Sequence, residues 1–160
     1  MIRRETFEKG AIPMSYIEGI AAQQAYLCYY CEHPMHRHQH VDGVPTPRDA
    51  ITKDHYIARA WGGETIPANM VAACCQCNNL RGDMEAEAFK NLMQKWFKRN
   101  PYTWIRWHTL TSEDLYELKL QCIRVHERQL RGKARRYIEF AYHHFDFTFR
   151  ERRRLSLTPT

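Results

Sequence analysis

Apolar residues recur every three or four positions in two parts of the chain, which predicts two amphipathic helices. Asp83 is placed to cap the first of these helices. Thr111 with Asp114 can cap the second, longer helix, in which Gly132 predicts a break or kink at residues 131–133. The first apolar stripe contains Phe89, Leu92, Met93, Trp96 and Phe97, and the second contains Leu115, Leu118, Cys122, Val125 and Leu130.

The rest of the pattern predicts a short N-terminal helix and two short strands. Ser15 followed by Glu18 is typical of a capping box, so we expect a helix through about Gln24. Apolar and β-branched residues predict strands at residues 49–57 and 70–73, joined by a loop that contains glycines and a proline. These elements predict an α+β fold with more helix than strand.

The chain is long enough for one main core. Its 160 residues are 44% hydrophobic, and no apolar run approaches the roughly 20 residues that span a bilayer. The first residues lack the apolar stretch of a secretory signal, so we expect a soluble cytoplasmic protein. We divide the chain into an N-terminal extension (residues 1–27), a central region (28–99) and a helical basic extension (100–160). Residues 101–110 alternate aromatic and polar positions, which leaves strand and loop open.

Two Cys-x-x-Cys pairs predict a structural metal site. Cys28 and Cys31 form one pair, and Cys74 and Cys77 form the other. Four thiolates at about 2.3 Å complete the tetrahedral coordination of Zn²⁺. In a reducing compartment this spacing favours a metal over the alternative of disulfides. Cys75 is an alternative ligand to Cys74, but a Cys-x-Cys spacing makes a poorer knuckle.

The net charge of +6 and the pI near 9.1 favour a polyanionic partner such as nucleic acid. Basic residues gather on the predicted C-terminal helix and at its end, where they could follow a phosphate backbone or remain solvated. The apolar stripe of the same helix is an alternative site for a homodimer contact. A histidine-rich segment could hold a second metal ion or form a solvated loop. The basic end contains Arg150, Arg152, Arg153 and Arg154, and the histidines are His33, His36, His38 and His40.

Residues suited to hydrolysis lie between and beside the cysteine pairs. Asp54 and His55 are adjacent at a predicted strand end, so their side chains point to opposite faces. One can then hold a cation while the other reaches a water molecule. Asn69 precedes the second strand, and Asn78 follows the last cysteine pair. The pattern indicates metal-assisted hydrolysis.

The central region resembles the HNH endonuclease pattern with zinc-ribbon cysteines. The resemblance implies a ββα-metal fold in which Asp54 and Asn78 hold one divalent ion, usually Mg²⁺ or Mn²⁺. It makes His55 the general base, Asn69 the residue that orients His55 and fixes the loop, and DNA the substrate. Arg59 and Arg81 would contact phosphates. The resemblance rests on Asp54-His55, Gly62-Gly63, Asn69, Cys74 to Asn78, and Arg81-Gly82-Asp83, within a stretch from Cys28 to Asp83.

Two other functions fit the same residues. One is a non-catalytic, zinc-stabilised module that binds nucleic acid, and the other is a nuclease for RNA or for a structured junction. A carboxylate and a histidine do not separate DNA from RNA, because both present the same phosphodiester. The small size resembles that of phage-encoded and mobile-element HNH proteins. A single ββα site cuts one strand per binding event, so we expect nicking, with double-strand cleavage requiring a dimer or two visits.

Overall fold

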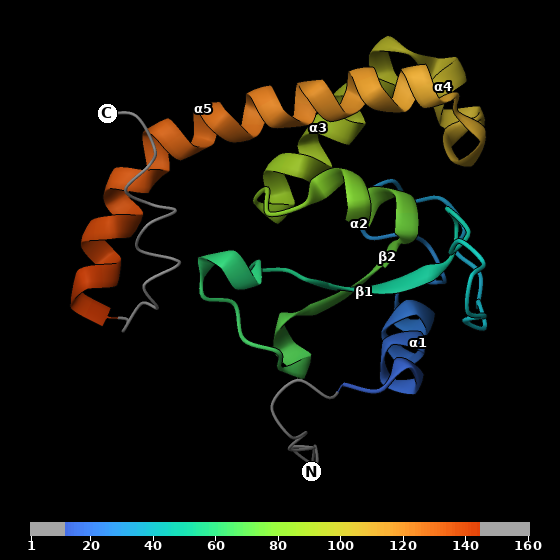
Figure 1. Cartoon of the computed structure of the whole chain (residues 1–160), viewed down its shortest axis with the longest axis horizontal. Helices are drawn as coiled ribbons and strands as arrows, with labels where there is room; N and C mark the ends of the chain where they lie inside the picture. The colour runs from blue at the N-terminus through green and yellow to red at the C-terminus, as the bar shows by residue number, and fades with distance from the viewer. Residues whose placement is uncertain (1–11, 145–160) are drawn as a thin grey trace. The chain divides into compact units, whose positions relative to one another are not determined.

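The structure is a computed structural model that describes the backbone of residues 12–144 and the side chains of residues 12–129. The chain divides into two compact units, residues 1–115 and 116–160. The sequence-based boundaries at residues 27 and 99 stay a prediction. In chain order (Figure 1), the elements are α1 (Met14–Gln23), β1 (Ile51–His55), the 3₁₀ turns η1 (Arg59–Trp61) and η2 (Pro67–Asn69), β2 (Met70–Cys74), α2 (Cys75–Arg81), α3 (Ala86–Arg99), α4 (Pro101–Ile105), the 3₁₀ turn η3 (Trp107–Thr109) and α5 (Ser112–His144).

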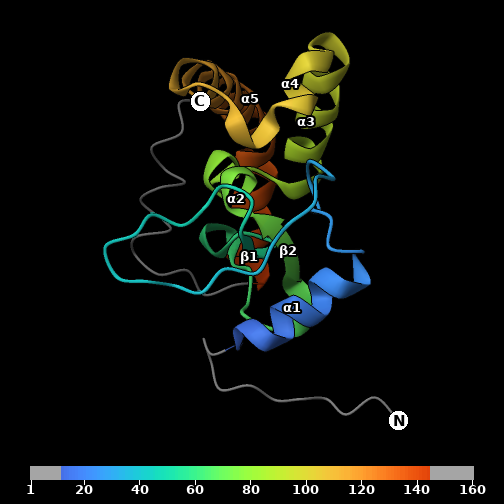
Figure 2. The same ribbon diagram turned by 90° about the vertical axis from the view of Figure 1, so that its right-hand side faces the viewer.

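The first unit contains an antiparallel hairpin followed directly by a helix. β1 pairs with β2 from Ile51 opposite Cys74 to His55 opposite Met70. α2 begins at the residue after β2 and contacts both strands. α1 also contacts both strands and lies on the other side of the hairpin from α2 (Figures 1 and 2). This ββα arrangement confirms the predicted α+β fold and both predicted strands.

Small residues and one glutamine side chain join α1 to the hairpin. Ala21 of α1 and Ala72 of β2 are fully buried, so the two backbones can approach closely. The side chain of Gln24 then pairs with the backbone of Ala72. Its Nε2 donates to the Ala72 carbonyl oxygen at 2.9 Å, and its Oε1 accepts from the Ala72 N–H at 3.1 Å. Gln24 therefore satisfies part of the free edge of β2, which would otherwise be exposed.

The start of α1 differs from the sequence-based expectation. The helix begins at Met14, its N-cap is Pro13, and no side chain caps it, so the predicted capping box of Ser15 and Glu18 is wrong. Pro13 has an extended backbone, with φ −68° and ψ 151°, directly before the helix. Proline fixes φ near this value. Because the helix starts directly after Pro13, Ser15 already lies inside it and cannot be its N-cap.

The region after α2 is more helical than predicted. α3 begins at Ala86, and its N-cap Glu85 makes no side-chain hydrogen bond, so the expected Asp83 cap is wrong. The predicted apolar stripe is confirmed in part by Phe89 and Met93, which are fully buried. Residues 101–110 form neither a strand nor only a loop, because α4 and η3 occupy most of them.

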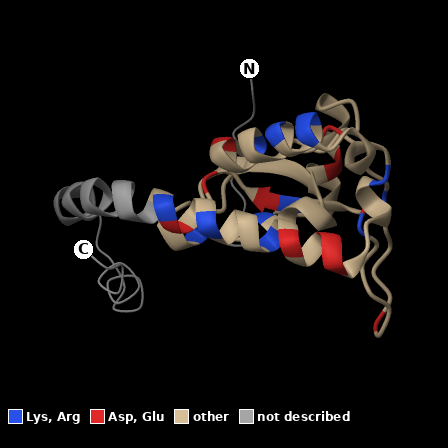
Figure 3. Ribbon diagram, turned by 90° about the horizontal axis from the view of Figure 1, so that it is seen from above, with Lys and Arg blue, Asp and Glu red and all other residues tan. Residues whose placement is uncertain are grey.

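The cap of α5 agrees with the prediction. Thr111 Oγ1 accepts a hydrogen bond from the Asp114 N–H at 3.2 Å and donates one to Asp114 Oδ2 at 2.8 Å. The helix is continuous through Gly132, so it is not broken there, while its axis bends in the C-terminal, deep-orange part of α5, as the alternative prediction of a kink at residues 131–133 allows (Figure 1). Acidic residues lie in its first turn, where the helix dipole favours them, and basic residues follow (Figure 3). Residues 150–154 lie outside the described part of the chain. No helix in the described part is long and apolar enough to cross a membrane.

Candidate functional site

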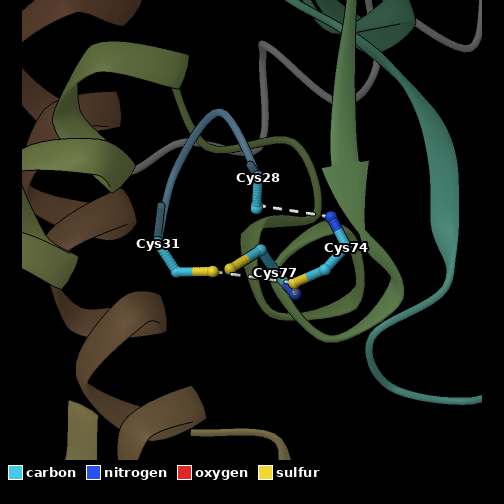
Figure 4. Close-up of side chains that lie close together, drawn as sticks. All are labelled: Cys28, Cys31, Cys74 and Cys77. Carbon is cyan, nitrogen blue, oxygen red and sulfur yellow. Dashed lines mark hydrogen bonds between the residues drawn. The ribbon is translucent and has the colours of Figure 1, made fainter. Parts of the chain in front are cut away.

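Four cysteines from two distant segments converge on one point. Cys28 and Cys31 lie in the segment after α1, Cys74 ends β2, and Cys77 is in the first turn of α2. All four are buried, and their Sγ atoms lie within 4.8 Å of one another (Figure 4). This spacing allows all four sulfur atoms to surround one ion. The structure thus confirms that Cys74, not Cys75, pairs with Cys77, because Cys75 stands outside the group.

The surroundings of these sulfur atoms fit a bound cation. The Cys74 N–H donates to Cys28 Sγ at 3.3 Å, and the Cys77 N–H donates to Cys74 Sγ at 3.4 Å. Such bonds favour a thiolate. Burial raises the pKa of Cys31 and Cys77, so these thiols stay protonated without a cation. Hydrogen bonds from Cys28, Cys31 and Cys77 lower the pKa of Cys74. A metal ion would release the remaining protons, since metals bind the thiolate form.

The histidines of residues 33–40 do not come together as a group of three or more potential metal ligands among the described residues. His33 is buried beside Trp104, with 4.4 Å between ring centroids. His36 pairs instead with Asp49 at 2.9 Å on the surface. Among the side chains that the structure describes, the four cysteines are the group of potential ligands that comes together.

Asp54 is buried at the end of β1, with one carboxylate oxygen occupied. Oδ2 accepts a hydrogen bond from the Tyr30 hydroxyl at 2.6 Å and one from Arg81 Nη1 at 2.7 Å. Both bonds converge on the same oxygen, and Oδ1 accepts no hydrogen bond from the residues that the structure describes. Burial beside Asp54 raises the pKa of Tyr30, so this phenol remains a donor. The carboxylate is therefore held in a fixed orientation with Oδ1 available to a ligand.

Arg81 lies inside the protein, where it holds the end of β1. Its side chain is 1% exposed. Besides Asp54, its N–H groups donate to the carbonyl oxygens of His55 at 2.5 Å, Tyr56 at 2.7 Å and Met84 at 2.8 Å. These bonds use four of the five N–H groups of a guanidinium. Arg81 is therefore buried, whereas the phosphate contact that the resemblance implies for it requires an exposed side chain.

Asn78 is fixed against β1 by its amide nitrogen. Nδ2 donates to Thr52 Oγ1 at 3.0 Å and to the Lys53 carbonyl oxygen at 3.1 Å. The Thr52 hydroxyl donates in turn to the Ala73 carbonyl oxygen at 2.8 Å, so its oxygen can accept from Asn78. Because both acceptors lie beside Nδ2, these two hydrogen bonds fix the direction in which the Asn78 amide group points. Among the residues that the structure describes, none donates a hydrogen bond to Asn78 Oδ1, so this oxygen on α2 can still accept one.

Asn69 fixes the loop that follows His55. Its Nδ2 donates to the carbonyl oxygens of Ile57 at 3.0 Å and Glu64 at 2.9 Å, and its Oδ1 accepts from the Ile57 N–H at 2.8 Å. Its carbonyl oxygen accepts from the Tyr56 N–H at 2.8 Å. The His55 ring bonds to a different residue, because Nε2 lies 2.9 Å from Thr65 Oγ1. Asn69 therefore shapes the loop around His55 without bonding to its ring.

Comparison with known families agrees with this geometry. Residues 28–84 match the family model described as HNH endonuclease, and the matched stretch contains both cysteine pairs, the hairpin and α2. Residues 28–84 are an HNH endonuclease domain. No curated protein and no solved structure matches the chain significantly.

The HNH domain contains contacts that sequence reasoning missed. Tyr30 lies between Cys28 and Cys31 in the sequence and bonds to Asp54, while Thr52 anchors Asn78 and Thr65 bonds to His55. Tyrosine and threonine are common in knuckles and loops, so their types alone give no signal. A signal was present only for Thr52, since alternation on β1 puts residue 52 on the same face as Asp54.

Gly63 should not tolerate alanine, because the loop packs onto itself there. A Cβ atom on Gly63 would lie 1.7 Å from the Ile57 carbonyl oxygen, so the backbone would have to move. We expect Gly63→Ala to lower the free energy of unfolding by about 1–3 kcal/mol, as overpacking does. In Gly19→Ala, the matched control, nothing lies within 4 Å, and a helical alanine should raise stability by about 0.5–1 kcal/mol. Urea unfolding of both variants checks this, and equal midpoints would contradict it.

The surroundings of His55 predict the pH dependence of any reaction in which it acts as a base. Burial, followed by the charge of Arg59, lowers the pKa of His55 below its usual 6.5. Activity should therefore persist below pH 6.5 and fall only as the pH drops through this lowered pKa. Arg59→Ala removes a positive charge and should shift the acid limb of kcat/KM to higher pH. An unshifted limb would show that Arg59 exerts no such effect.

Proposed function

We propose that the HNH domain is a metal-dependent endonuclease that hydrolyses DNA phosphodiester bonds, nicking one strand per binding event. The observation that carries this proposal is the way Asp54, His55 and Asn78 are held. Internal hydrogen bonds fix each side chain, and within the described residues one acceptor atom of each remains unbonded. The candidate base and one candidate ligand thus lie side by side in sequence at the end of β1, and the second candidate ligand lies on α2, which contacts that strand.

Asp54 and Asn78 would hold the catalytic ion, Mg²⁺ or Mn²⁺. Carboxylate and amide oxygens are the ligands that hard divalent ions prefer. Because Arg81 balances the charge of Asp54, the protein itself offers little net negative charge, which suits an ion that keeps most of its water. When bound, such an ion polarises the scissile phosphate and stabilises the departing 3′ oxygen.

His55 would accept a proton from the attacking water. Its lowered pKa keeps the imidazole neutral at pH 7, which is the form that can act as a base. The water oxygen then bonds to phosphorus as the bond to the 3′ oxygen breaks. The products carry a 5′-phosphate and a 3′-hydroxyl. Asn69 supports this step by holding the loop after His55.

We assign Zn²⁺ and a structural role to the four-cysteine site. Four buried thiolates match the tetrahedral coordination of zinc and leave no open position for water or substrate. Zinc here would join the segment after α1 to the end of β2 and to α2. Cys31 and Cys74, whose Sγ atoms are 3.9 Å apart, come from the two segments that it would join.

DNA is the partner that an HNH domain favours, and exposed basic residues support it. Arg59 and Lys53 are exposed, and both are close enough to His55 to affect its pKa. Arg59 is therefore the residue that we assign to phosphate contact, while the buried Arg81 supports Asp54. A homodimer through α5, a cytoplasmic location and a phage or mobile-element origin stay predictions.

The substrate class is tested with labelled duplex DNA, single-stranded DNA, RNA and a four-way junction in Mg²⁺ or EDTA. We expect duplex DNA to be cut in Mg²⁺ only, with 5′-phosphate and 3′-hydroxyl ends. Faster cutting of RNA or of the junction would change the substrate assignment. Binding to duplex DNA without cutting of any substrate would favour a non-catalytic module.

A further inference from the structure

The contact between Thr65 and His55 lies in a loop whose position is tightly fixed. Thr65 is half-buried, and its Oγ1 lies 2.9 Å from His55 Nε2. On one side of it, the Glu64 carbonyl oxygen accepts from Asn69 Nδ2 at 2.9 Å. On the other side, the Ile66 carbonyl oxygen accepts from the Asn69 N–H at 2.9 Å. Bonds to both neighbours thus hold Thr65 in place at the histidine ring.

A histidine base needs one particular arrangement of its single ring proton. A neutral imidazole carries the proton on one nitrogen and a lone pair on the other, and the hydrogen bond at one nitrogen decides which. Nε2 of His55 faces Thr65, and Nδ1 makes no hydrogen bond with the described residues. Only a proton on Nε2 leaves Nδ1 able to accept one from water. A threonine hydroxyl oxygen can accept the Nε2 hydrogen bond.

We propose that Thr65 is a positioning residue that accepts a hydrogen bond from His55 Nε2–H and so keeps Nδ1 free as the base. The proposal rests on the function proposed above for His55. It also gives Asn69 an indirect part in catalysis, since Asn69 fixes the residues on either side of Thr65. The loop between the strands therefore sets both the orientation of the ring and its tautomer.

Thr65→Val and Thr65→Ser test this role in the full chain. Valine has nearly the same shape as threonine but no hydroxyl group, whereas serine keeps it. We expect Thr65→Val to slow single-turnover cleavage about 10- to 100-fold, by analogy with the loss of a group that orients a metal-bound histidine. Thr65→Ser should stay within a few-fold of wild type. Thr109→Val is the matched control, because Thr109 is exposed and, among the described residues, its hydroxyl donates to the Arg106 carbonyl oxygen alone.

Nitrogen-15 NMR of the His55 ring gives a readout that does not require activity. We expect the Nε2–H tautomer in wild type and in Thr65→Ser, and a mixture of tautomers in Thr65→Val. An Nδ1–H tautomer in wild type, or the same spectrum and rate in Thr65→Val, would overturn the proposal. If no variant cuts DNA, the nuclease proposal fails. The effect of Thr65→Val on the tautomer then still decides whether Thr65 orients His55.

Discussion

Replacing His55 by alanine is expected to slow single-turnover cleavage of duplex DNA by about 10²- to 10⁴-fold, the range for a positioned general base. The variant removes the imidazole at the end of β1, while the backbone contacts there remain. In particular, the His55 carbonyl oxygen still accepts from Arg81 Nη1. The fold, the zinc content and the affinity for DNA should therefore change little.

His40→Ala is the matched control for this variant. His40 is likewise a histidine within residues 28–84, but its side chain pairs with Asp42, is 73% exposed and lies outside the candidate site. It should cleave at the wild-type rate. A His55→Ala rate within a few-fold of the wild-type rate would show that another group accepts the proton, and the role assigned to His55 would be wrong.

Replacing Cys31 by alanine is expected to unfold the first unit or leave it without its metal. A structural zinc contributes on the order of 10 kcal/mol to a small fold, which is comparable to the whole stability of a typical domain, about 5–15 kcal/mol. Because all four cysteines are buried, the variant also leaves an incomplete ligand set inside the core. Zinc content and thermal unfolding measure the effect, and a chelator should reproduce it in wild type.

Cys75→Ala is the control that distinguishes the loss of a metal ligand from the loss of any cysteine. Cys75 is next to a ligand in sequence, yet it is only half-buried and lies outside the four-cysteine group. We expect it to bind zinc and unfold as wild type does. An equal loss of zinc in both variants would contradict the ligand assignment, and retention of zinc in Cys31→Ala would contradict the four-cysteine site itself.

The core of the site could be predicted because its spacing is local and chemically distinctive. Two Cys-x-x-Cys pairs have few functions other than metal binding, so Cys28, Cys31, Cys74 and Cys77 were identified without a structure. The two strands followed from short apolar runs next to these pairs. Asn78 was chosen because the HNH pattern has a polar ligand after the last cysteine pair, and its part in metal binding stays a prediction. The structure adds how its amide is anchored.

Contacts made through loops could not be predicted in this way. In the sequence, Arg81 follows the second cysteine pair, and nothing there predicts that its side chain is buried. Only the folded chain brings the carbonyl groups of residues 55 and 56 to its guanidinium. Thr65 meets His55 because Asn69 fixes a loop with no periodic pattern. The aromatic alternation of residues 101–110 left strand and loop open, but Pro101 begins α4 and Trp107 is fully buried in η3. Packing of this kind overrides weak local preferences.

Cleavage of supercoiled plasmid by wild type and His55→Ala, each with Mg²⁺ or EDTA, tests the central claim most directly. Both proteins should first be shown to contain zinc and to be folded, so that only the candidate site differs. We predict that wild type with Mg²⁺ converts the plasmid mainly to the nicked form, and that the other three reactions leave it supercoiled. Equal nicking by His55→Ala, or nicking by wild type in EDTA, would contradict a metal-dependent site that uses His55 as its base.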